Sequence, residues 1–485
     1  MSRHTSLVAA LLLAGCTLTT QEAARERARM ESAGAVYEHD DDAARRSAPE
    51  LPPRPDWRDV LRHAFLANGE LEAAYYAWRA AVERIDVAAG YPNTNVELGF
   101  EYLFSGGNLT GWDRTSLSVG FDPMQNLSFP TKVMAAGRVA TEEARAAGER
   151  FAAAKFALQR QVLTAWLDYA LLAEQIRVQR ELRDLLAIAA EGAAARVAGG
   201  RPQDELLAAD VAHGHAEHEL LELESQLPAA RARLNALIGR SPDAPLPPPD
   251  LPEPRPLPDD ALLLAVGTRA NPELAALGRD VAGRAEALDL ARQQYLPDIN
   301  PFAGITGSME QVVGAAITLA TTIPQIQAGI REARANLRAS EALARQGELD
   351  REAAFVAALL ALRSAERQRA VLERHVMASA QQAAAAAERA YATGSGDFAT
   401  WLAAQRTLLE LRLTIAETRV ARERRVAELE LLAGVDAERL AALAESEEGR
   451  LALVGGTEAL ALTSAAGDDA ATLASAHGAA GEVAR

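Results

Sequence analysis

Cysteine pairs, long apolar runs and an excess of basic residues are all missing from this 485-residue sequence. Cys16 is its single cysteine, so no disulfide can form within the chain. No stretch reaches the roughly 18 consecutive apolar residues of a helical membrane span, so a segment that enters a membrane is expected to do so as strands. Asp and Glu number 67 against 50 Lys and Arg. Without a net basic field, nucleic acid is not expected as the main partner.

Aromatic residues and catalytic motifs are also scarce. Phe, Trp and Tyr make up only 5% of the residues while alanine dominates, a composition typical of long helices packed closely together. The sequence contains no Gly-rich phosphate loop and no His-Glu-x-x-His motif, and its Ser, His and Asp residues are scattered. We therefore expect neither an enzyme nor a bound cofactor.

The N-terminus has the order of a secretory signal. Arg3 and His4 precede an apolar run, and the sequence LAGC ends that run at Cys16. LAGC resembles a bacterial lipobox, which implies a signal peptide over residues 1–15 and a lipidated Cys16. Thr17 rather than Asp follows the cysteine, and by the same resemblance this favours delivery to the outer membrane. The alternative is a cysteine buried on a core helix, which the order of charge, apolar run and small residues disfavours.

Two stretches alternate between apolar and polar residues, as β-strands do. The first predicted hairpin covers residues 94–122, with a Gly-rich loop between strands of about 11 and 9 residues that suit a tilted crossing of a bilayer. The second covers residues 298–321, where the alternation is weaker and Phe302 interrupts it. In the first hairpin one face carries Leu98, Phe100, Leu117, Val119 and Phe121, and the other carries Glu97, Glu101, Ser116 and Ser118.

The hairpins belong to a duplicated unit of helix, hairpin, long helix and return helix. Gly199, Leu207, Ala209 and Gly239 match Gly394, Leu402, Ala404 and Gly434 at one constant offset. After an extended polar tether, 16–56, with room for one short helix, the expected first repeat is 57–245. It contains one helix from about Trp57 to Ala89, a long helix 130–198 of about 100 Å and a return helix 203–238. A Pro-rich linker, 246–258, leads to the second repeat, 259–440, with a long helix 324–392 and a return helix 397–433, and then to a disordered Ala/Gly-rich tail, 441–485.

Two hairpins supply only four strands, and this number has a consequence for assembly. Transmembrane barrels of a single chain begin at about eight strands, and an open sheet edge cannot lie in lipid. The four strands must therefore be completed by other copies of the chain. Two copies give eight strands and three give twelve.

These features together resemble the TolC family of outer-membrane efflux channels, over about residues 57–440. The resemblance rests on the lipobox, the repeats with their hairpins and proline-headed long helices, and the turns RVAGGRPQDELLAAD and YATGSGDFATWLAAQ. It implies a mainly α fold with a small membrane β-barrel, that is, a homotrimer with an α-barrel across the periplasm and a twelve-stranded β-barrel in the outer membrane. Residues FPTKVMAAGR resemble the heavy-metal branch.

The resemblance also implies partners and a role. The partners are outer-membrane lipid, a periplasmic adaptor and an inner-membrane pump, with the adaptor docking at the helix tips marked by Gly199, Gly200, Gly394 and Gly396. The implied role is passage of small toxic solutes, drugs or metal ions, to the outside. A channel for type I protein secretion and a coiled-coil lipoprotein scaffold in the periplasm remain alternatives. A periplasmic adaptor is disfavoured, because it has one helical hairpin flanked by compact β domains.

Acidic residues at the tips are gate candidates. Channels select with rings of charge at constrictions, and the family closes its periplasmic end partly with acids at the start of the return helices. The positions expected to be acidic in the second repeat hold Thr400 and Ala403, so Asp204, Glu205 and Asp397 are the candidates that remain. The same residues also suit ordinary acids at helix N-termini, and both interpretations stay open.

A histidine cluster on the first return helix is the one candidate metal site. His215, His218, Glu219 and Glu222 share a helix face, while His213 lies off it. These residue types can bind a metal weakly. We favour an ordinary solvated face, because no further ligand or supporting shell is evident.

Overall fold

A computed structural model describes residues 20–34, 36–37, 50–91, 96–104, 109–121, 128–199, 203–308, 310–319, 321–439 and 441. The expected lipidation site Cys16, the tip residue Gly200 and the expected tail beyond residue 441 lie outside these ranges. The described part of the chain contains no helix that is both long and apolar enough to span a membrane.

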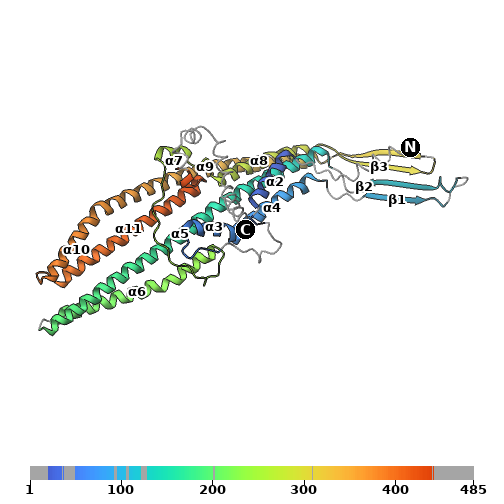
Figure 1. The fold of residues 1–485 in the computed structure, drawn as a ribbon. Coiled ribbons are helices and arrows are strands. Elements are labelled where there is room, and N and C mark those ends of the chain that lie inside the picture. The colour runs from blue at the N-terminus through green and yellow to red at the C-terminus, as the bar shows by residue number, and fades with distance from the viewer. Residues whose placement is uncertain are drawn as a thin grey trace, which may run out of the picture. The chain divides into compact units, whose positions relative to one another are not determined.

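The described part of the chain is mainly helical and carries one small sheet (Figure 1). In chain order the elements are α2 (Gln21–Gly34), α3 (Trp57–Ala67), α4 (Gly69–Ala89), β1 (Val96–Tyr102), β2 (Thr115–Phe121), α5 (Pro130–Ala198), α6 (Asp204–Leu237), α7 (Asp260–Val266), α8 (Pro272–Gln293), β3 (Asp298–Thr306), β4 (Glu310–Thr318), α9 (Ile323–Val371), the π-helical turn η2 (Leu372–Val376), α10 (Met377–Ala392) and α11 (Phe398–Ala433). A hairpin, a long helix and a return helix therefore occur twice in the same order.

Two compact units contain these elements. Unit 1 consists of Met1–Ala35, Ala74–Phe151 and Pro272–Glu348, and includes the sheet. Unit 2 consists of Val36–Ala73, Ala152–Asn271 and Leu349–Arg485, and includes both return helices. The long helices α5 and α9 contribute residues to both units.

Helix α2 occupies part of the segment expected to be an extended tether. It packs within unit 1, where Trp78 Nε1 donates a hydrogen bond to Glu26 Oε1 (2.9 Å) and the Tyr75 hydroxyl donates to Met30 Sδ (3.2 Å). A side chain at Gly148 would collide with Trp78 and Glu26, so this glycine lets α2 approach α5 closely. Residues 21–34 thus form the one short helix for which the expected tether had room, and this helix is docked on the rest of unit 1.

The four strands form one antiparallel sheet in the order β1-β2-β3-β4. Leu98 pairs with Val119, Val119 with Ala303, and Ala303 with Val313. Directly opposite residues point to the same face, so apolar positions of all four strands share one face of the sheet. The opposite face carries rows such as Glu101, Ser116, Thr306 and Glu310.

Phe302, which interrupts the alternation, lies on the polar face without disturbing the register. Both of its neighbours across the sheet are glycines, Gly120 on β2 and Gly314 on β4. Near the sheet, Lys132 Nζ pairs with Asp298 Oδ1 at 2.8 Å and joins the start of α5 to the start of β3. Lys132 is almost fully buried, so this ion pair ties the helical part of unit 1 to its strands.

Unit 2 is held by apolar contacts between its helices. The pair α5 and α6 packs through Leu172, Ile176 and Leu220. A second cluster joins α7, α9 and α11, with Leu362 and Val426 fully buried. In the middle of α5, Val162, Leu163, Trp166, Leu167 and Tyr169 are all buried, so this helix is packed on more than one side.

Two helices differ from their sequence-based expectation. The helix expected from Trp57 to Ala89 is divided at Asn68, whose side chain accepts hydrogen bonds from the backbone N–H groups of Glu70 and Leu71 (both 3.0 Å) and donates to Leu237 O (2.9 Å). Asn68 thus caps α4, as asparagine often caps a helix. The helix expected over residues 324–392 contains the π-helical turn η2.

The π-helical turn matches a difference in length between the repeats. One residue more separates Pro324 from Gly394 than separates Pro130 from Gly199. A π-turn holds one residue more than an α-turn, so η2 accommodates the extra residue. Glu373 lies in this turn and is paired with Arg419 Nη2 at 3.0 Å.

Candidate functional site

Glycines end the helices at the tips of unit 2. Gly394 has a φ of 73°, the left-handed conformation that glycine adopts without strain. Gly396 lies so close to α10 that a Cβ there would be 3.0 Å from Ala390 Cβ. The N–H of Gly199 donates to Ala195 O at 3.2 Å and ends α5. These glycines allow the chain to turn at the tips. Any charged or polar group at the tips belongs to neighbouring residues, because glycine has no side chain.

Glu205 is the gate candidate that the structure brings into a polar cluster. Its Oε1 accepts hydrogen bonds from Arg196 Nη2 at 2.7 Å and from the Tyr391 hydroxyl at 2.5 Å, and Arg196 also bonds Tyr391. The guanidinium of Arg196 lies 4.8 Å from the centre of the Tyr391 ring. We call Arg196, Glu205 and Tyr391 the tip clasp, because it joins α5 and α6 of the first repeat to α10 of the second.

Aromatic residues of a buried cluster pack against the Tyr391 ring of the tip clasp. The Tyr391 ring stacks on Trp401 with centroids 5.3 Å apart, and Phe398 packs beside Trp401. Trp401 and Phe398 belong to a buried cluster with Leu186 of α5 and Ala212 of α6, among others. The cluster fixes the ring of Tyr391 and so fixes the direction in which its hydroxyl points.

The ionisation of the tip clasp follows from this geometry. Burial and the neighbouring carboxylate of Glu205 raise the pKa of Tyr391 to about 12. The phenol therefore keeps its proton at neutral pH and can donate it in the hydrogen bond to Glu205. Arg196 balances the charge of Glu205, so this acid does not contribute an unpaired negative charge to the tip.

The other two gate candidates have different surroundings. Asp397 caps α11 by accepting a hydrogen bond from Thr400 N at 2.6 Å, and its hydrogen bonds with Thr400 lower its pKa. Asp204 is exposed in the first turn of α6, where a negative charge favours the helix dipole. The geometry of Asp397 is that of an ordinary helix cap.

The candidate metal residues lie on the surface of α6. His215, His218, Glu219 and Glu222 are all exposed, and Glu219 Oε2 accepts a hydrogen bond from Gln179 Nε2 at 2.9 Å. Within the described ranges, no three or more His, Cys, Asp or Glu side chains are arranged to hold a metal ion.

The apolar face of the sheet is the second candidate surface. Leu98 is 77% exposed, Phe100 70% and Val313 89%, and Ile317 and Leu319 continue the surface on the same side. Exposed apolar surface of this extent is unusual for a protein surrounded by water and marks an interaction site. The side chain of Phe121, expected on this face, is outside the described part of the structure.

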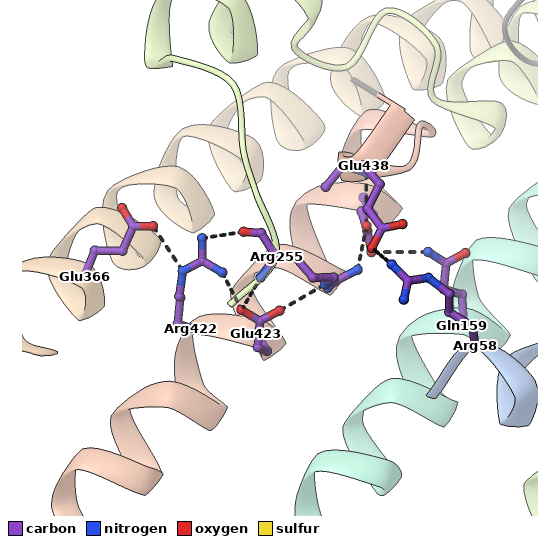
Figure 2. A network of polar contacts seen from close by, with 9 residues as sticks. Arg58, Gln159, Arg255, Glu366, Arg422, Glu423 and Glu438 are labelled. Atoms are coloured by element: carbon purple, nitrogen blue, oxygen red, sulfur yellow. Dashed lines mark hydrogen bonds and ion pairs between the residues drawn. The ribbon is translucent and has the colours of Figure 1, made fainter. Parts of the chain in front are cut away.

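A buried ionic network holds the Pro-rich linker, and no motif in the sequence indicates this network. Figure 2 shows Arg255 of the linker between Glu423 of α11 and the next turns of that helix. Its Nε donates to Glu423 Oε2 at 2.9 Å and its Nη1 to Glu430 Oε1 at 2.8 Å, with all three side chains less than 10% exposed. Burial opposes the charge of Arg255, yet the two carboxylates outweigh it and raise its pKa.

The linker is therefore a fixed part of unit 2. Arg422 donates to the carbonyl oxygen of Arg255 at 2.8 Å, and the Tyr169 hydroxyl donates to Leu246 O at 2.8 Å. Neither Arg255 nor Tyr391 is marked by a motif in the sequence. A signal existed only for Tyr391, which lies at the position in the second repeat that matches Arg196 in the first.

Comparisons with known proteins show what this fold resembles. No protein-family profile and no curated protein sequence matches the chain. Among solved structures, CusC matches with a TM-score of 0.65 and 16% identity, covering 82% of this chain and 96% of CusC. The outer membrane protein VceC from Vibrio cholerae matches with a TM-score of 0.64 and 16% identity, over 79% of this chain and 97% of VceC. The MtrE outer membrane channel of Neisseria gonorrhoeae, in its open state, matches with a TM-score of 0.63 and 17% identity, over 79% and 90%.

These likenesses establish the fold. The chain has the fold of outer-membrane channels, and the resemblance to the TolC family drawn from the sequence is confirmed at that level.

Proposed function

We propose that the chain is the outer-membrane component of a tripartite efflux system. In this proposal three copies form an exit channel for small toxic solutes, either drugs or metal ions. A lipid on Cys16 anchors each copy to the outer membrane, and the helices form a tunnel across the periplasm. A periplasmic adaptor meets the tips at Gly199, Gly200, Gly394 and Gly396, and an inner-membrane pump supplies the solute.

The observation that carries the proposal is the apolar face of the sheet. Its rows run in register over four strands and stay exposed in the protomer. Lipid is the surrounding in which such a face is stable. The strand order gives the sheet two edges, β1 and β4, and edges cannot remain unpaired in lipid. Pairing β4 of one copy with β1 of the next closes the sheet, and three copies give twelve strands.

The same closure assigns the polar face to the lumen. Glu101, Ser116, Thr306 and Glu310 form one row on that face. A polar interior facing water and an apolar exterior facing lipid are the usual division in membrane barrels.

The tip clasp suits the role of a gate. It joins helices of the two repeats through Glu205, and opening the tip by separating those helices requires breaking its hydrogen bonds. In this proposal Glu205 helps to close the tunnel by its hydrogen bonds to Arg196 and Tyr391. It does not act as one member of a ring of unpaired negative charges. Asp204 and Asp397 act at most through the local potential at the tip.

Reconstitution tests the proposal directly. The full-length lipoprotein, purified in detergent, is expected to be trimeric by mass and to form discrete conducting channels in planar bilayers. The scaffold alternative predicts no conductance and predicts release from membranes once the lipid anchor is removed. A monomer without conductance would overturn the proposal.

A further inference from the structure

Phe302 is the one aromatic residue on the polar face among the described residues of β1 to β4. The row to which it belongs contains Gly120 and Gly314 on the adjoining strands. The neighbouring rows on this face carry Ser118, Gly304 and Val312 on one side and Asn300 with Ala316 on the other, none of them as large as phenylalanine. A large ring in such surroundings requires a specific place to lie.

Gly314 provides the place for the ring, while Gly120 leaves room beside the base of the Phe302 side chain. A Cβ at Gly314 would be only 2.7 Å from Phe302 Cζ, and 3.1 and 3.3 Å from the two Cε atoms. The outer half of the ring therefore covers the backbone of Gly314 and lies along the sheet. On the other side, a Cβ at Gly120 would be 3.3 Å from Phe302 Cβ. Glycine within a strand often marks such a close approach.

We propose that Phe302, lying in the recess over Gly314, sets the width of the lumen at its level. This inference rests on the proposed channel, in which the polar face lines the lumen. While the ring lies flat over Gly314, it adds little thickness to the wall. If a side chain at position 314 filled this recess, the ring would have to stand away from the sheet. Because the channel contains three copies, three rings would then narrow the same level.

The clash at Gly314 involves the far end of the Phe302 side chain, which can turn about its own torsions. Filling the recess should therefore move the ring and leave the strands paired. The conductance of a narrow pore decreases as its radius decreases, so single-channel conductance reports the position of the ring.

The test is a double-mutant cycle on single-channel conductance in planar bilayers. One change is Gly314→Val, and the other is Phe302→Ala. The matched control is Gly304→Val, on the same face, where a Cβ makes only ordinary contacts at 3.7 and 4.0 Å. We expect the filled recess to lower conductance more than the control does. In the Phe302→Ala background the loss should shrink to the size of the control. An equal loss in both backgrounds would overturn the inference.

A second series covers the case in which the filled recess prevents assembly. Phe302→Ala and Phe302→Trp leave both glycines in place, and conductance should rank Ala, Phe, Trp from highest to lowest. Equal conductance of the three proteins would also overturn the inference, while the channel itself would stand. A wild-type protein that does not conduct would overturn the proposed function as well.

Discussion

Arg196 donates a hydrogen bond to the hydroxyl of Tyr391, and the two residues are 195 positions apart. That separation is the offset that relates Gly199 to Gly394 and Gly239 to Gly434. Two matching positions of the duplicated chain thus contact each other where the helices turn. The first repeat has an arginine at this position and the second has a tyrosine. Both side chains donate a hydrogen bond to Glu205.

This pairing predicts that weakening the tip clasp opens the channel. Tyr391→Phe removes the hydroxyl that donates a hydrogen bond to Glu205, while the ring can keep its stacking on Trp401. Glu205→Gln replaces the charged acceptor. Each variant should raise the open probability, because a hydrogen bond to a charged group contributes about 1.5–3 kcal/mol. Single-channel recording measures this change.

Asp204→Asn is the control for the loss of charge. It removes one acid next to Glu205, but Asp204 is exposed and lies outside the clasp. The control should conduct with the same open probability as the wild type. If it opens the channel as much as Glu205→Gln does, charge alone acts at the tip and the clasp has no part.

Arg255→Met should destabilise unit 2 strongly. The change leaves Glu430 buried without its cation and leaves Glu423 paired with Arg422 alone, and removing one partner of a buried ion pair typically costs about 3–5 kcal/mol. Arg292→Met is the matched control, because Arg292 forms an exposed pair with Asp289, for which about 0–1 kcal/mol is expected. Thermal unfolding in detergent, followed by circular dichroism, compares the two. Equal midpoints would show that the network does not stabilise the linker.

The two hairpins are joined at the loop before β2, which predicts a pH dependence. Asp113 Oδ1 accepts hydrogen bonds from the N–H (3.0 Å) and the hydroxyl of Ser308, and the bonds from Ser308 and Thr110 lower the Asp113 pKa to about 2. A lowered pKa favours the folded state above the unfolded pKa of about 4, and this contribution is lost as pH falls through about 2. Asp113→Asn should therefore reduce the heat resistance of the trimer at pH 7.

The difference between Asp113→Asn and the wild type should persist at pH 5 and disappear near pH 2. Gel migration of unheated and heated samples after incubation at each pH measures it. Thr115→Ser, a nearby change outside the Asp113 contacts, controls for general damage to the hairpin. A difference that is the same at every pH would mean that the charge of Asp113 is not involved.

Periodicity allowed much of this fold to be predicted. Alternation placed Leu98 and Val119 on one face, and the turns at Gly199 and Gly394 marked the ends of the helices correctly. Features that depend on contacts between distant residues could not be found in this way. Arg255 looks like any polar residue in a Pro-rich linker until Glu423 and Glu430 approach it from α11.

The same limit explains the differences in local structure. Helix α2 is polar and short, and what holds it is the fit between Met30, Glu26 and the surface made by Tyr75 and Trp78. The π-turn η2 depends on one extra residue, which is visible only when the lengths of the two repeats are compared. In the site, Glu205 was a candidate from the sequence because an acidic residue at the start of a helix can be recognised from its immediate neighbours. Its partners Arg196 and Tyr391 were not, because hydrogen bonds between the two repeats leave no such local pattern.

The most direct test of the membrane barrel compares the two faces of β2. Val119 lies on the apolar face opposite Leu98, while Ser118 lies on the polar face opposite Gly99. An arginine facing lipid near the bilayer midplane costs about 2–4 kcal/mol per copy, whereas a lumen position costs far less. Val119→Arg should therefore reduce the amount of heat-resistant trimer in outer-membrane fractions. Ser118→Arg should leave the trimer intact and change its conductance, since three positive charges would then line the lumen.

The two variants are matched controls for each other, because they introduce the same side chain at adjacent positions of one strand. Their protein levels before membrane insertion should be equal. If both lose the trimer to the same extent, arginine disturbs β2 regardless of the face, and the alternation does not mark a membrane barrel. If both assemble normally, the apolar face does not contact lipid, and the exposed row from Leu98 to Val313 needs a protein partner instead.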